Sequence, residues 1–403
     1  MNILVLNAGS SSQKSCLYRL GSKIADSPPE PLWSAHIEWS KTAGMMEVKA
    51  GGAKVAIELA AGDSATAISK MLETLVVGDV QILDDLADID VVGHRVVHGG
   101  SAYSQPVLVD DEVKVAIADL SVLAPAHNPA NLAGIEAIEL CLGNVPQVAV
   151  FDTAFHSQMP LTSAVYPIPY QFFEEGIRRY GFHGISHDYC SRRAAQIVDT
   201  PLDTLKLINC HLGNGCSLAA VDGGIGIDTT MGFTPLEGLM MGTRSGSIDP
   251  AILLHLMRTK GYDADRLDTM LNRESGLKGV SGISGDMREI GAAIANGNQR
   301  AQLAFDLYVH RLKSAIGAMV ASLGGLDVLV FTAGVGEHSA MVREQVCRGL
   351  EFLGVTLDAA LNSASPMDTV ISAPDSAVTV LVIHTEEDWA IAKACWQLRQ
   401  QLR

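Results

Sequence analysis

Two segments that lie far apart in this chain carry the same pattern, and that repeat limits the folds available to it. Residues 3–12 and 207–217 each consist of an apolar run, a polar turn containing glycine, and a second strand-like run. Apolar runs typical of buried strands alternate with helical patterns along the chain, at residues 90–93, 148–151, 205–208, 328–331 and 378–383. This alternation predicts an α/β fold. The repeat predicts two similar halves that face one cleft.

The length of the chain predicts two domains, because 403 residues exceed the usual domain size of about 100–200 residues. Hydrophobic residues make up 48% of the sequence, which is enough to fill sizeable cores. A buried strand is expected to end near Asp152, and a loop over residues 153–160 follows it. We therefore expect one domain over residues 1–152 and a second over residues 153–387.

The acidic balance of the sequence narrows the range of partners. A formal net charge of −16 argues against nucleic acid or an anionic membrane, because both would repel such a surface. Small anions would need local clusters of Arg and Lys inside a pocket. Residues 316–336 form the most apolar stretch, but Gly324, Gly325 and Asp327 divide it into a helix end and a buried strand. We therefore expect no membrane span.

Cysteine usage indicates a reducing compartment. The seven cysteines are odd in number and include no C-x-x-C pair, which fits neither a disulfide framework nor a zinc site. The N-terminus has no basic region ahead of its short apolar run, so that run indicates a strand rather than a signal peptide. We expect a cytoplasmic protein.

The turn at residues 7–14 has the composition of a phosphate-binding loop. Gly9 permits a tight reversal, Ser12 and the two serines before it offer hydroxyl and amide groups, and Lys14 supplies positive charge where a terminal phosphate would lie. The segment lacks the second glycine and the spacing of a Walker A loop. Residues 15–20 indicate a returning strand, so we expect a β-hairpin tip with its polar side chains in a cleft. The alternative is an ordinary Ser/Gly hairpin turn.

Residues 94–100 place an arginine between two histidines. On a strand, alternation puts Arg95 and Val97 on one face and His94 and His98 on the other. A planar guanidinium beside a small apolar wall suits a short carboxylate with an alkyl tail. A metal site at His94 and His98 is the less favoured alternative to a structural histidine pair.

Further polar side chains stand next to glycines. Arg244 lies in a glycine-flanked turn over residues 238–250, which would hold it stiffly before a helix that begins near Asp249. His183, His211 and Asn214 each neighbour a glycine, where a side chain can reach a ligand while the backbone approaches closely. The alternative is that each histidine is structural.

Two predicted strand ends lie towards the C-terminus. Residues 331–337 predict a strand that runs into a glycine turn, which suits the base or ribose of a nucleotide; the alternative is an ordinary strand-to-helix turn. Residues 383–388 end another strand in carboxylates, and Glu387 could hold Mg²⁺ through water. The alternative there is an acidic helix N-terminus, which the helix dipole favours.

Taken together, these segments resemble the acetate kinase family. The resemblance follows the family's order over essentially the whole chain, through residues 7–14, 94–100, 123–129, 151–156, 179–184, 211–215, 241–246, 331–337 and 385–387. It implies two similar actin-like, ribonuclease H-like domains with a central cleft, a C-terminal helix over residues 388–403 that completes the first domain, and a homodimer. Ser247, His338 and Glu386 depart from the pattern, at positions where Asp, Asn and Asn are common.

The resemblance also implies a reaction: reversible transfer of the γ-phosphoryl group of ATP to acetate, with Mg²⁺, to give acetyl phosphate and ADP. A carboxylate with a pKa of about 4 is already ionised at neutral pH, so the reaction needs no strong general base. It needs cations instead, because the equatorial oxygens of the transferring phosphoryl group carry charge in the transition state.

The roles of individual residues follow from the same resemblance. Arg95 and Arg244 orient acetate and stabilise the developing charge, and His183 donates to an equatorial oxygen. The resemblance implies that Asn7, Asp152 and Glu387 hold Mg²⁺ directly or through water, and that Asp152 is also a catalytic residue. The implied ATP-binding residues are Ser12, Lys14, His211, Asn214, Gly215, Asp286, Arg288 and Gly334, and the cup for the methyl group consists of Val97, Leu123, Phe182 and Pro235.

Two rival functions stay open at this point. Propionate kinases share most of these motifs and differ mainly in the size of the cup, where Val97 favours the smaller acid. One methylene contributes only about 1–3 kcal/mol of discrimination, so some activity on propionate is expected. An Hsp70-like or actin-like ATPase would share the fold, but it would leave the paired arginines unexplained.

Overall fold

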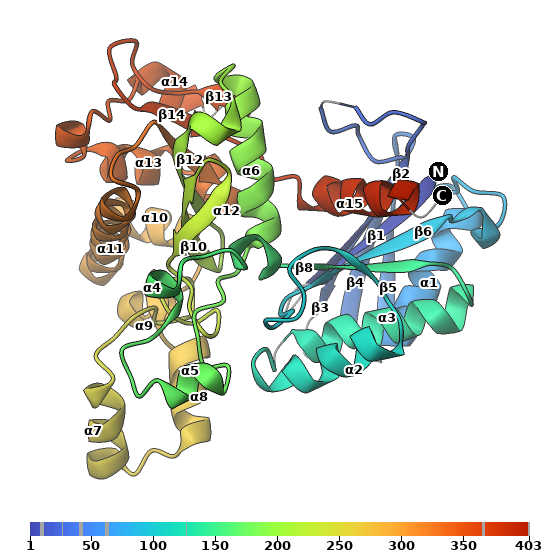
Figure 1. Cartoon of the computed structure of the whole chain (residues 1–403), viewed down its shortest axis with the longest axis horizontal. Helices are drawn as coiled ribbons and strands as arrows, with labels where there is room; N and C mark the ends of the chain where they lie inside the picture. The colour runs from blue at the N-terminus through green and yellow to red at the C-terminus, as the bar shows by residue number, and fades with distance from the viewer. Residues whose placement is uncertain are drawn as a thin grey trace. The chain divides into compact units, whose positions relative to one another are not determined.

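The computed structural model describes residues 1–8, 12–25, 27–39, 43–60, 64–125, 127–364 and 367–401. Contacts within the chain divide it into two compact units. Unit 1 comprises Met1–Ala154 and Glu386–Arg403, and unit 2 comprises Phe155–Thr385. Each unit contains one mixed β-sheet with helices packed against it (Figure 1). The domain boundaries expected from the sequence stay predictions.

The sheet of unit 1 has the strand order β5-β4-β3-β2-β1-β6-β8-β7. Strands β1 to β5 form an antiparallel meander, and β6 and β8 continue the sheet parallel to β1. The strands are β1 (Asn2–Ala8), β2 (Ser12–Arg19), β3 (Trp33–Trp39), β4 (Ala43–Ala50), β5 (Ala53–Ala60), β6 (Val91–Val96), β7 (Val107–Leu108) and β8 (Gln147–Phe151).

The sheet of unit 2 has the order β11-β10-β9-β12-β14-β13. Strands β9, β10 and β11 are antiparallel, and β12 and β14 lie parallel to β9. The strands are β9 (Lys206–Leu212), β10 (Cys216–Asp222), β11 (Ile225–Thr229), β12 (Val328–Thr332), β13 (Thr369–Val370) and β14 (Thr379–Val382).

The repeat seen in the sequence is a repeat of topology. Both sheets contain an antiparallel meander, β1–β2–β3 continuing into β4 and β5 in unit 1 and β9–β10–β11 in unit 2, and two parallel strands follow on the side of its first strand. The hairpin β1–β2 therefore corresponds to β9–β10, with Ala8 opposite Gln13 in the first and Leu212 opposite Cys216 in the second. The returning strand predicted after Lys14 is confirmed as β2. Residues 9–11 of the expected phosphate-binding turn lie outside the described residues.

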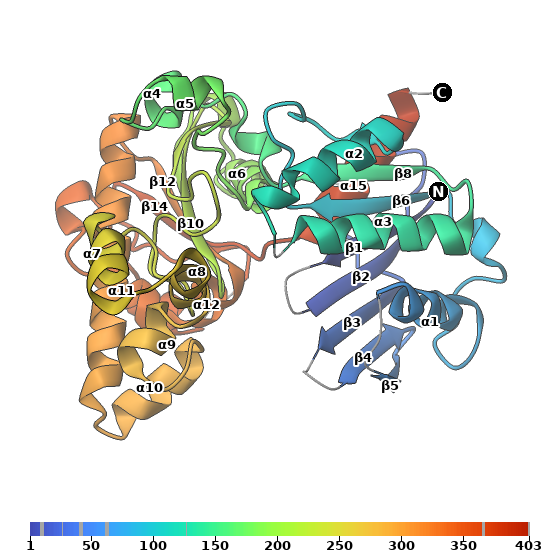
Figure 2. The same cartoon turned by 90° about the horizontal axis from the view of Figure 1, so that it is seen from below.

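Helices cover both faces of the unit 1 sheet. Helix α15 packs on β1 and β6 from one side, and α3 packs on the same strands from the other (Figure 1). Helix α3 also lies beside α1, as Figure 2 shows. Gly93 in β6 permits the close approach of α15, because a Cβ there would lie 2.6 Å from Cys395 Sγ and from a methyl group of Ile391. The helices are α1 (Ser64–Val76), α2 (Asp111–Asp119), α3 (Asn128–Leu142) and α15 (Glu387–Gln401).

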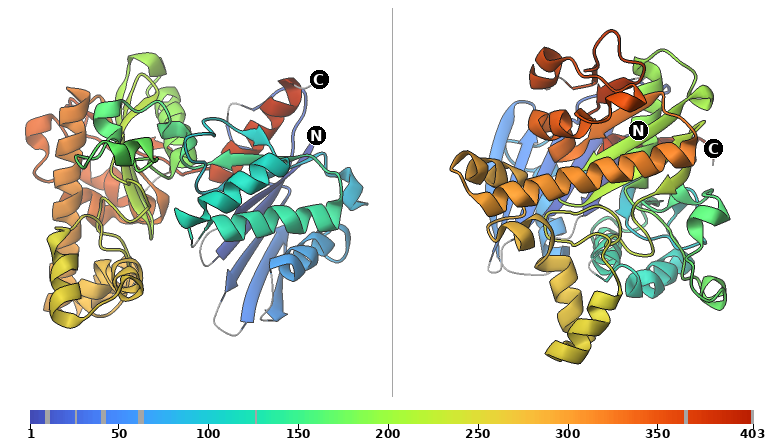
Figure 3. Two further views of the ribbon diagram at one scale, coloured as in Figure 1. Left: turned by 60° about the horizontal axis from the view of Figure 1, so that its bottom comes forward. Right: turned by 90° about the vertical axis from the view of Figure 1, so that its left-hand side faces the viewer.

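The unit 2 sheet is packed between α6 and α11. Helix α6 contacts β9 and β12, while the long helix α11 crosses β10, β11 and β9 (Figure 3, right). The helices are α4 (Leu161–Ala164), α5 (Gln171–Glu174), α6 (Gly184–Ile197), α7 (Ala251–Lys260), α8 (Ala264–Arg273), α9 (Gly276–Ser281), α10 (Met287–Ala295), α11 (Gln299–Leu323), α12 (Ala333–His338), α13 (Ala340–Cys347) and α14 (Ala359–Ala364). Among the helices in the described ranges, none is both long and apolar enough for a bilayer crossing.

Candidate active site

The central feature of unit 1 is an ion pair between the half-buried Arg95 and the buried Asp152. Arg95 lies in β6, and Asp152 follows β8, so both stand at the carboxyl ends of neighbouring parallel strands. Arg95 Nε donates to Asp152 Oδ1 at 3.1 Å, and Nη2 donates to Oδ2 at 2.5 Å. Burial alone would lower the pKa of Arg95, but the charges of Asp152 and Glu387 outweigh it and raise that pKa. The guanidinium is therefore charged and held in a fixed plane.

Asn7 connects this ion pair to two further carboxylates. Its Oδ1 accepts from Arg95 Nη1 at 3.2 Å, and its Nδ2 donates to Glu387 Oε2 at 3.2 Å and to Asp388 Oδ1 at 2.9 Å. Burial, together with the negative charge of Glu387, raises the pKa of Asp388, while Lys14 acts in the opposite direction. Four of the predicted residues, Asn7, Arg95, Asp152 and Glu387, thus belong to one bonded cluster.

The backbone after β6 is held by two asparagines of α3. Val97 N–H donates to Asn131 Oδ1 at 3.2 Å, and His98 N–H donates to Asn128 Oδ1 at 3.1 Å. The strand expected to carry both Arg95 and Val97 ends at Val96, because these asparagines bond the next two backbone N–H groups. That the two side chains share a face stays a prediction. Val97 is nevertheless buried, and Leu123 is half-buried beyond α2.

His94 and His98 each have a different hydrogen-bond partner. His94 Nε2 lies 2.6 Å from Gln147 Oε1, and His98 Nδ1 accepts the N–H of Gly100 at 3.0 Å. Burial lowers the pKa of His94 to about 4, although its bond to Gln147 opposes the shift. His94 is therefore a neutral core side chain at physiological pH.

In unit 2, His183 and His211 form a stacked pair. Their ring centroids lie 4.1 Å apart with an interplanar angle of 18°. His183 precedes α6 with a left-handed backbone, φ 57°, a conformation that is uncommon for residues other than glycine. His183 Nδ1 lies 2.9 Å from Ser217 Oγ, and His211 Nδ1 lies 2.9 Å from Ser186 Oγ. Each ring is therefore oriented by a serine hydroxyl.

Gly215 is the point at which Arg244 and His183 approach one another. A Cβ on Gly215 would lie 3.3 Å from Arg244 Nη1 and 3.5 Å from His183 Nε2. Arg244 Nη1 also donates to the carbonyl oxygen of Pro235 at 2.9 Å. The structure thus brings together a predicted arginine, a predicted histidine and a predicted wall of the methyl cup within unit 2.

Ser247, which departs from the family pattern, bonds the two ends of the loop that carries Arg244. Gly238 N–H donates to Ser247 Oγ at 3.0 Å, and Ser247 N–H donates to the Gly238 carbonyl oxygen at 2.9 Å. Asp249 accepts the N–H of Ala251 at 2.9 Å and so caps the start of α7. Ser247 therefore contributes to the stiffness that the glycine-rich sequence predicted.

Four other predicted residues of unit 2 lie on three separate elements. Asn214 packs against Gly242, where a Cβ would lie 2.1 Å from Asn214 Oδ1. Asp286 caps α10 and pairs with the exposed Arg288, Nη2 to Oδ2 at 2.6 Å. Gly334 lies in α12. Their shared role in ATP binding stays a prediction.

The glycine turn predicted after residue 331 is a short helix instead. Helix α12 begins directly after β12, and the residue with positive φ is Ala333, at 62°, rather than one of the glycines. Glu337 Oε1 accepts the N–H of Ala333 at 2.8 Å, and Glu337 Oε2 lies 2.6 Å from His384 Nδ1. These bonds hold a conformation that alanine alone disfavours. The alternative weighed for this segment, a strand-to-helix turn, is what the structure contains.

Comparison with known proteins identifies the family of this chain. The family model described as the acetokinase family matches residues 2–393. The chain belongs to the acetokinase family. The acetate kinase of Rippkaea orientalis is 62% identical over 398 residues, which cover 98% of this chain and 98% of that protein.

Two solved structures share the fold of this acetokinase family member. The acetate kinase of Porphyromonas gingivalis is 42% identical with a TM-score of 0.90, covering 99% of each chain. A propionate kinase from Francisella tularensis is 39% identical with a TM-score of 0.89, covering 98% of each chain. The predicted α/β fold with two similar domains is confirmed by these likenesses and by the matching sheet topologies.

The cluster around Arg95 suits the Mg²⁺ that the acetokinase resemblance implies. Asp152, Glu387 and Asp388 place three carboxylates near the cations Arg95 and Lys14, and oxygen ligands are those that Mg²⁺ prefers. Within the described residues, no group of three or more His, Cys, Asp or Glu side chains converges tightly enough to enclose a metal. The residues therefore fit an ion shared with phosphate oxygens and water rather than one held by protein alone.

Several residues of this candidate site are not apparent from the sequence alone. Asp388 is half-buried and bonded to Asn7, although the sequence indicates only a strand that ends in carboxylates there. Ser217 and Ser186 were also missed, although they orient the two stacked histidines. A polar residue in the apolar strand after the 211–215 turn is the sequence feature that could have identified Ser217.

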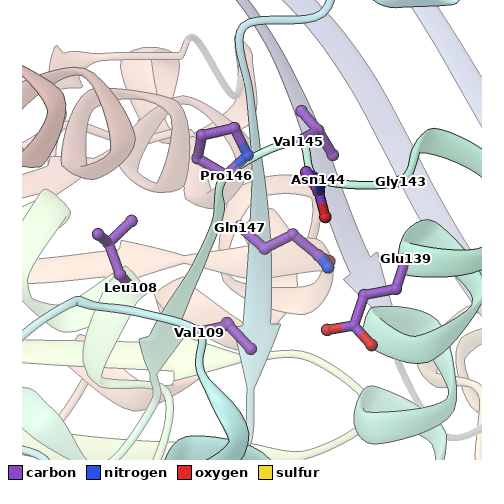
Figure 4. Close-up of a pocket in the computed structure, with 8 residues that line it drawn as sticks. All are labelled: Leu108, Val109, Glu139, Gly143, Asn144, Val145, Pro146 and Gln147. Carbon is purple, nitrogen blue, oxygen red and sulfur yellow. The ribbon is translucent and has the colours of Figure 1, made fainter.

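One surface pocket of about 470 Å³ lies away from the residues of the candidate site (Figure 4). It opens at the amino end of β8, whereas Asp152 follows the carboxyl end of the same strand. Its lining residues are Leu108, Val109, Glu139, Gly143, Asn144, Val145, Pro146 and Gln147. None of the residues predicted for catalysis or binding is among them.

Proposed function

We propose that this chain catalyses the reversible, Mg²⁺-dependent transfer of the γ-phosphoryl group of ATP to acetate by direct in-line attack, giving acetyl phosphate and ADP. The observation that carries the proposal is the Arg95 guanidinium, fixed by Asp152 and Asn7 in a member of the acetokinase family. A guanidinium fork binds both oxygens of a carboxylate, and a fixed fork loses little entropy on doing so. Similarity to proteins named acetate kinase supports the same activity.

Arg95 has two roles in this proposal. It orients the acetate carboxylate, and it stabilises charge on the transferring phosphoryl group. Asp152 accepts from Nε and Nη2 and Asn7 accepts from Nη1, so these two side chains set the plane in which the second N–H groups of Nη1 and Nη2 are presented. Acetate is already an anion at neutral pH, so none of these groups has to remove a proton from it.

Residues of unit 2 act on the phosphoryl group. His183 and Arg244 are proposed to donate to its equatorial oxygens, since a fixed donor aimed at developing charge contributes strongly to the rate. The side chains of His211 and Asn214 and the backbone of Gly215 are proposed to contact the ATP phosphates, together with Ser12 and Lys14 of unit 1. Asp286, Arg288 and Gly334 are proposed for the adenosine, and Val97, Leu123, Phe182 and Pro235 for the methyl group.

Asn7, Asp152 and Glu387, with the newly found Asp388, would hold Mg²⁺ directly or through water. When bound, Mg²⁺ neutralises charge on the transferring phosphate. We also propose that the enzyme is a cytoplasmic homodimer with a central cleft between its domains, as the family resemblance implies. Light scattering of the purified protein tests the dimer, and a monomer mass would contradict it.

A trapping experiment tests the reaction. The purified chain is incubated with ATP, Mg²⁺ and acetate, and hydroxylamine captures any acyl phosphate as a hydroxamate. We expect hydroxamate that depends on all three reactants and on Arg244, because Arg244→Ala removes a phosphoryl donor. If the rate of ATP hydrolysis does not depend on acetate and no hydroxamate forms, the result would favour an actin-like or Hsp70-like ATPase instead.

A further inference from the structure

A chain of three side chains leads from the interior of unit 2 to His183. Ser217 Oγ lies 2.9 Å from His183 Nδ1 and 2.8 Å from His187 Nε2, so one hydroxyl serves two imidazoles. Ser217 and His187 are both completely buried. His187 stands one helical turn after His183 on α6, and Ser217 lies on the adjacent strand β10. Packing therefore fixes the position of all three groups.

A single hydroxyl hydrogen can be directed at only one of the two rings. If Ser217 donates to His183, it must accept from His187, and if it donates to His187, it must accept from His183. The first arrangement puts hydrogens on Nε2 of both rings. The second puts them on Nδ1 of both rings. The structure distinguishes the two arrangements at His187.

Nδ1 of His187 is a buried atom with no hydrogen-bond partner in the part of the chain that the structure describes. Burial lowers the pKa of His187 well below its usual value, so this ring is neutral and carries one hydrogen. A hydrogen on Nδ1 would be a buried donor without an acceptor, which proteins avoid more strictly than an unused acceptor. The hydrogen of His187 therefore belongs on Nε2.

A neighbouring histidine shows the same preference. His156 Nε2 lies 3.3 Å from the carbonyl oxygen of Phe182, which can only accept, so His156 must carry its hydrogen on Nε2. Its Nδ1 is then an unused acceptor, and this atom too is buried without a partner among the described residues. An unprotonated, buried Nδ1 is thus already present beside His187, at 5.6 Å between ring centroids.

We propose that His187 and Ser217 are positioning residues that hold His183 as the tautomer with its hydrogen on Nε2. His187 Nε2–H donates to Ser217, Ser217 O–H donates to His183 Nδ1, and His183 presents Nε2–H on the side of Gly215 and Arg244. The Nε2–H group of His183 then lies beside the guanidinium of Arg244. Both groups can donate hydrogen bonds to an oxygen of the phosphoryl group. The catalytic use of this donor rests on the proposed function, whereas the tautomer itself does not.

Nitrogen NMR of the substrate-free protein tests the tautomer directly. Long-range proton–nitrogen spectra of histidine-labelled wild type distinguish a protonated ring nitrogen from an unprotonated one, and His183→Gln assigns the signals. We expect an unprotonated Nδ1 and a protonated Nε2 on His183 at neutral pH, and a mixture of tautomers in Ser217→Ala. A protonated Nδ1 in the wild type would overturn the inference, whatever the protein's activity.

Kinetics test the consequence. Ser217→Ala is expected to lower kcat roughly tenfold, the lower end of the loss seen when the hydrogen-bond partner of a metal-bound histidine is removed, with little change in the KM for acetate. In a His183→Ala background the same substitution should cost no further activity, because both changes remove one donor. A full additional loss in that background would show that Ser217 acts through general packing and would overturn the inference.

Two further variants separate positioning from stability. Ser191→Ala removes a fully buried hydroxyl on α6 that donates to the His187 carbonyl oxygen and accepts from Asn209 Nδ2, each at 2.7 Å, and kcat should be retained. His187→Gln keeps a donor that can reach Ser217, so it should preserve the His183 tautomer and more activity than His187→Leu. If the wild type shows the expected tautomer but forms no acetyl phosphate, the proposed function fails while the inference stands.

Discussion

The guanidinium of Arg95 and the carboxylate of Asp152 lie side by side at the carboxyl ends of two neighbouring parallel strands. Two separate nitrogens of Arg95 reach the two oxygens of Asp152, and the side chains are 15% and 1% exposed. A pair of this kind gains little net stability when both partners are present, because both charges have left water. Removing one partner is costly, however, because it leaves the charge of the other partner away from water without a counter-ion.

Arg95→Ala should therefore lose stability as well as activity. The substitution leaves the Asp152 carboxylate buried without its cation, a change that costs about 3–5 kcal/mol in buried pairs. We expect a fall of that size in the free energy of unfolding, measured by urea denaturation, together with a loss of kcat. Lys114→Ala, which breaks a more exposed ion pair with Glu139, is the control and should cost about 1 kcal/mol or less. Equal losses in the two variants would contradict the role given to the buried pair.

Most of the sheet framework could be predicted from the sequence, because buried strands are continuous apolar runs that need no information from distant residues. The runs at 90–93, 148–151, 205–208, 328–331 and 378–383 correspond to β6, β8, β9, β12 and β14. The repeat of topology was visible for the same reason, since each hairpin is a local pattern.

Side-chain partners between distant segments could not be predicted in the same way. Asp388 reaches Asn7 across a sequence separation of 380 residues or more, through the packing of α15 on β1. The end of β6 before Val97 depends on asparagines supplied by α3. In each case a local pattern was overruled by a hydrogen bond formed only in the folded chain.

Buried histidines should make the protein sensitive to acid. Burial lowers the pKa of both His94 and His156 from 6.5 to about 4. As the pH falls from 6.5 towards 4, the unfolded chain takes up protons that the folded chain cannot, so folding stability is lost in that window. The contribution of each histidine approaches about 1.4 kcal/mol per pH unit.

The comparison of two variants isolates this effect from other acid-sensitive groups. His94→Gln retains a side chain that can bond Gln147 but does not titrate, so its free energy of unfolding should fall less steeply with acid than that of the wild type. His255→Gln, an exposed position on α7, serves as the control. Urea denaturation across the pH range gives both slopes, and identical slopes for His94→Gln and the wild type would refute the assignment.

Gly215→Ala should impair catalysis with little effect on stability. The added methyl group would lie 3.3 Å from Arg244 Nη1, so that side chain would have to move by a few tenths of an ångström, whereas its distance of 3.5 Å from His183 Nε2 is ordinary contact. Displaced donors stabilise transition-state charge poorly, and we expect kcat to fall while the melting temperature changes little. Gly317→Ala in α11 adds a methyl group that meets nothing within 4 Å and should keep wild-type kcat. Unchanged turnover in Gly215→Ala would remove this contact from the proposed site.

Val97→Ala should shift the acid preference towards propionate. Val97 is 4% exposed, directly follows the strand that carries Arg95, and is proposed to line the cup for the methyl group. Removing two methyl groups makes room for the extra methylene of propionate. Because a pocket discriminates between substrates that differ by one methylene by about 1–3 kcal/mol, the ratio of kcat/KM for acetate over propionate should fall by about tenfold or more. Val96→Ala is the matched control: Val96 is 0% exposed and belongs to the core cluster with Ile117 and Phe151, so it loses the same volume away from the substrate. Competition between the two acids at equal concentration measures the ratio. A shift of equal size in both valine variants would mean that a general loss of core packing, and not the cup, sets the preference.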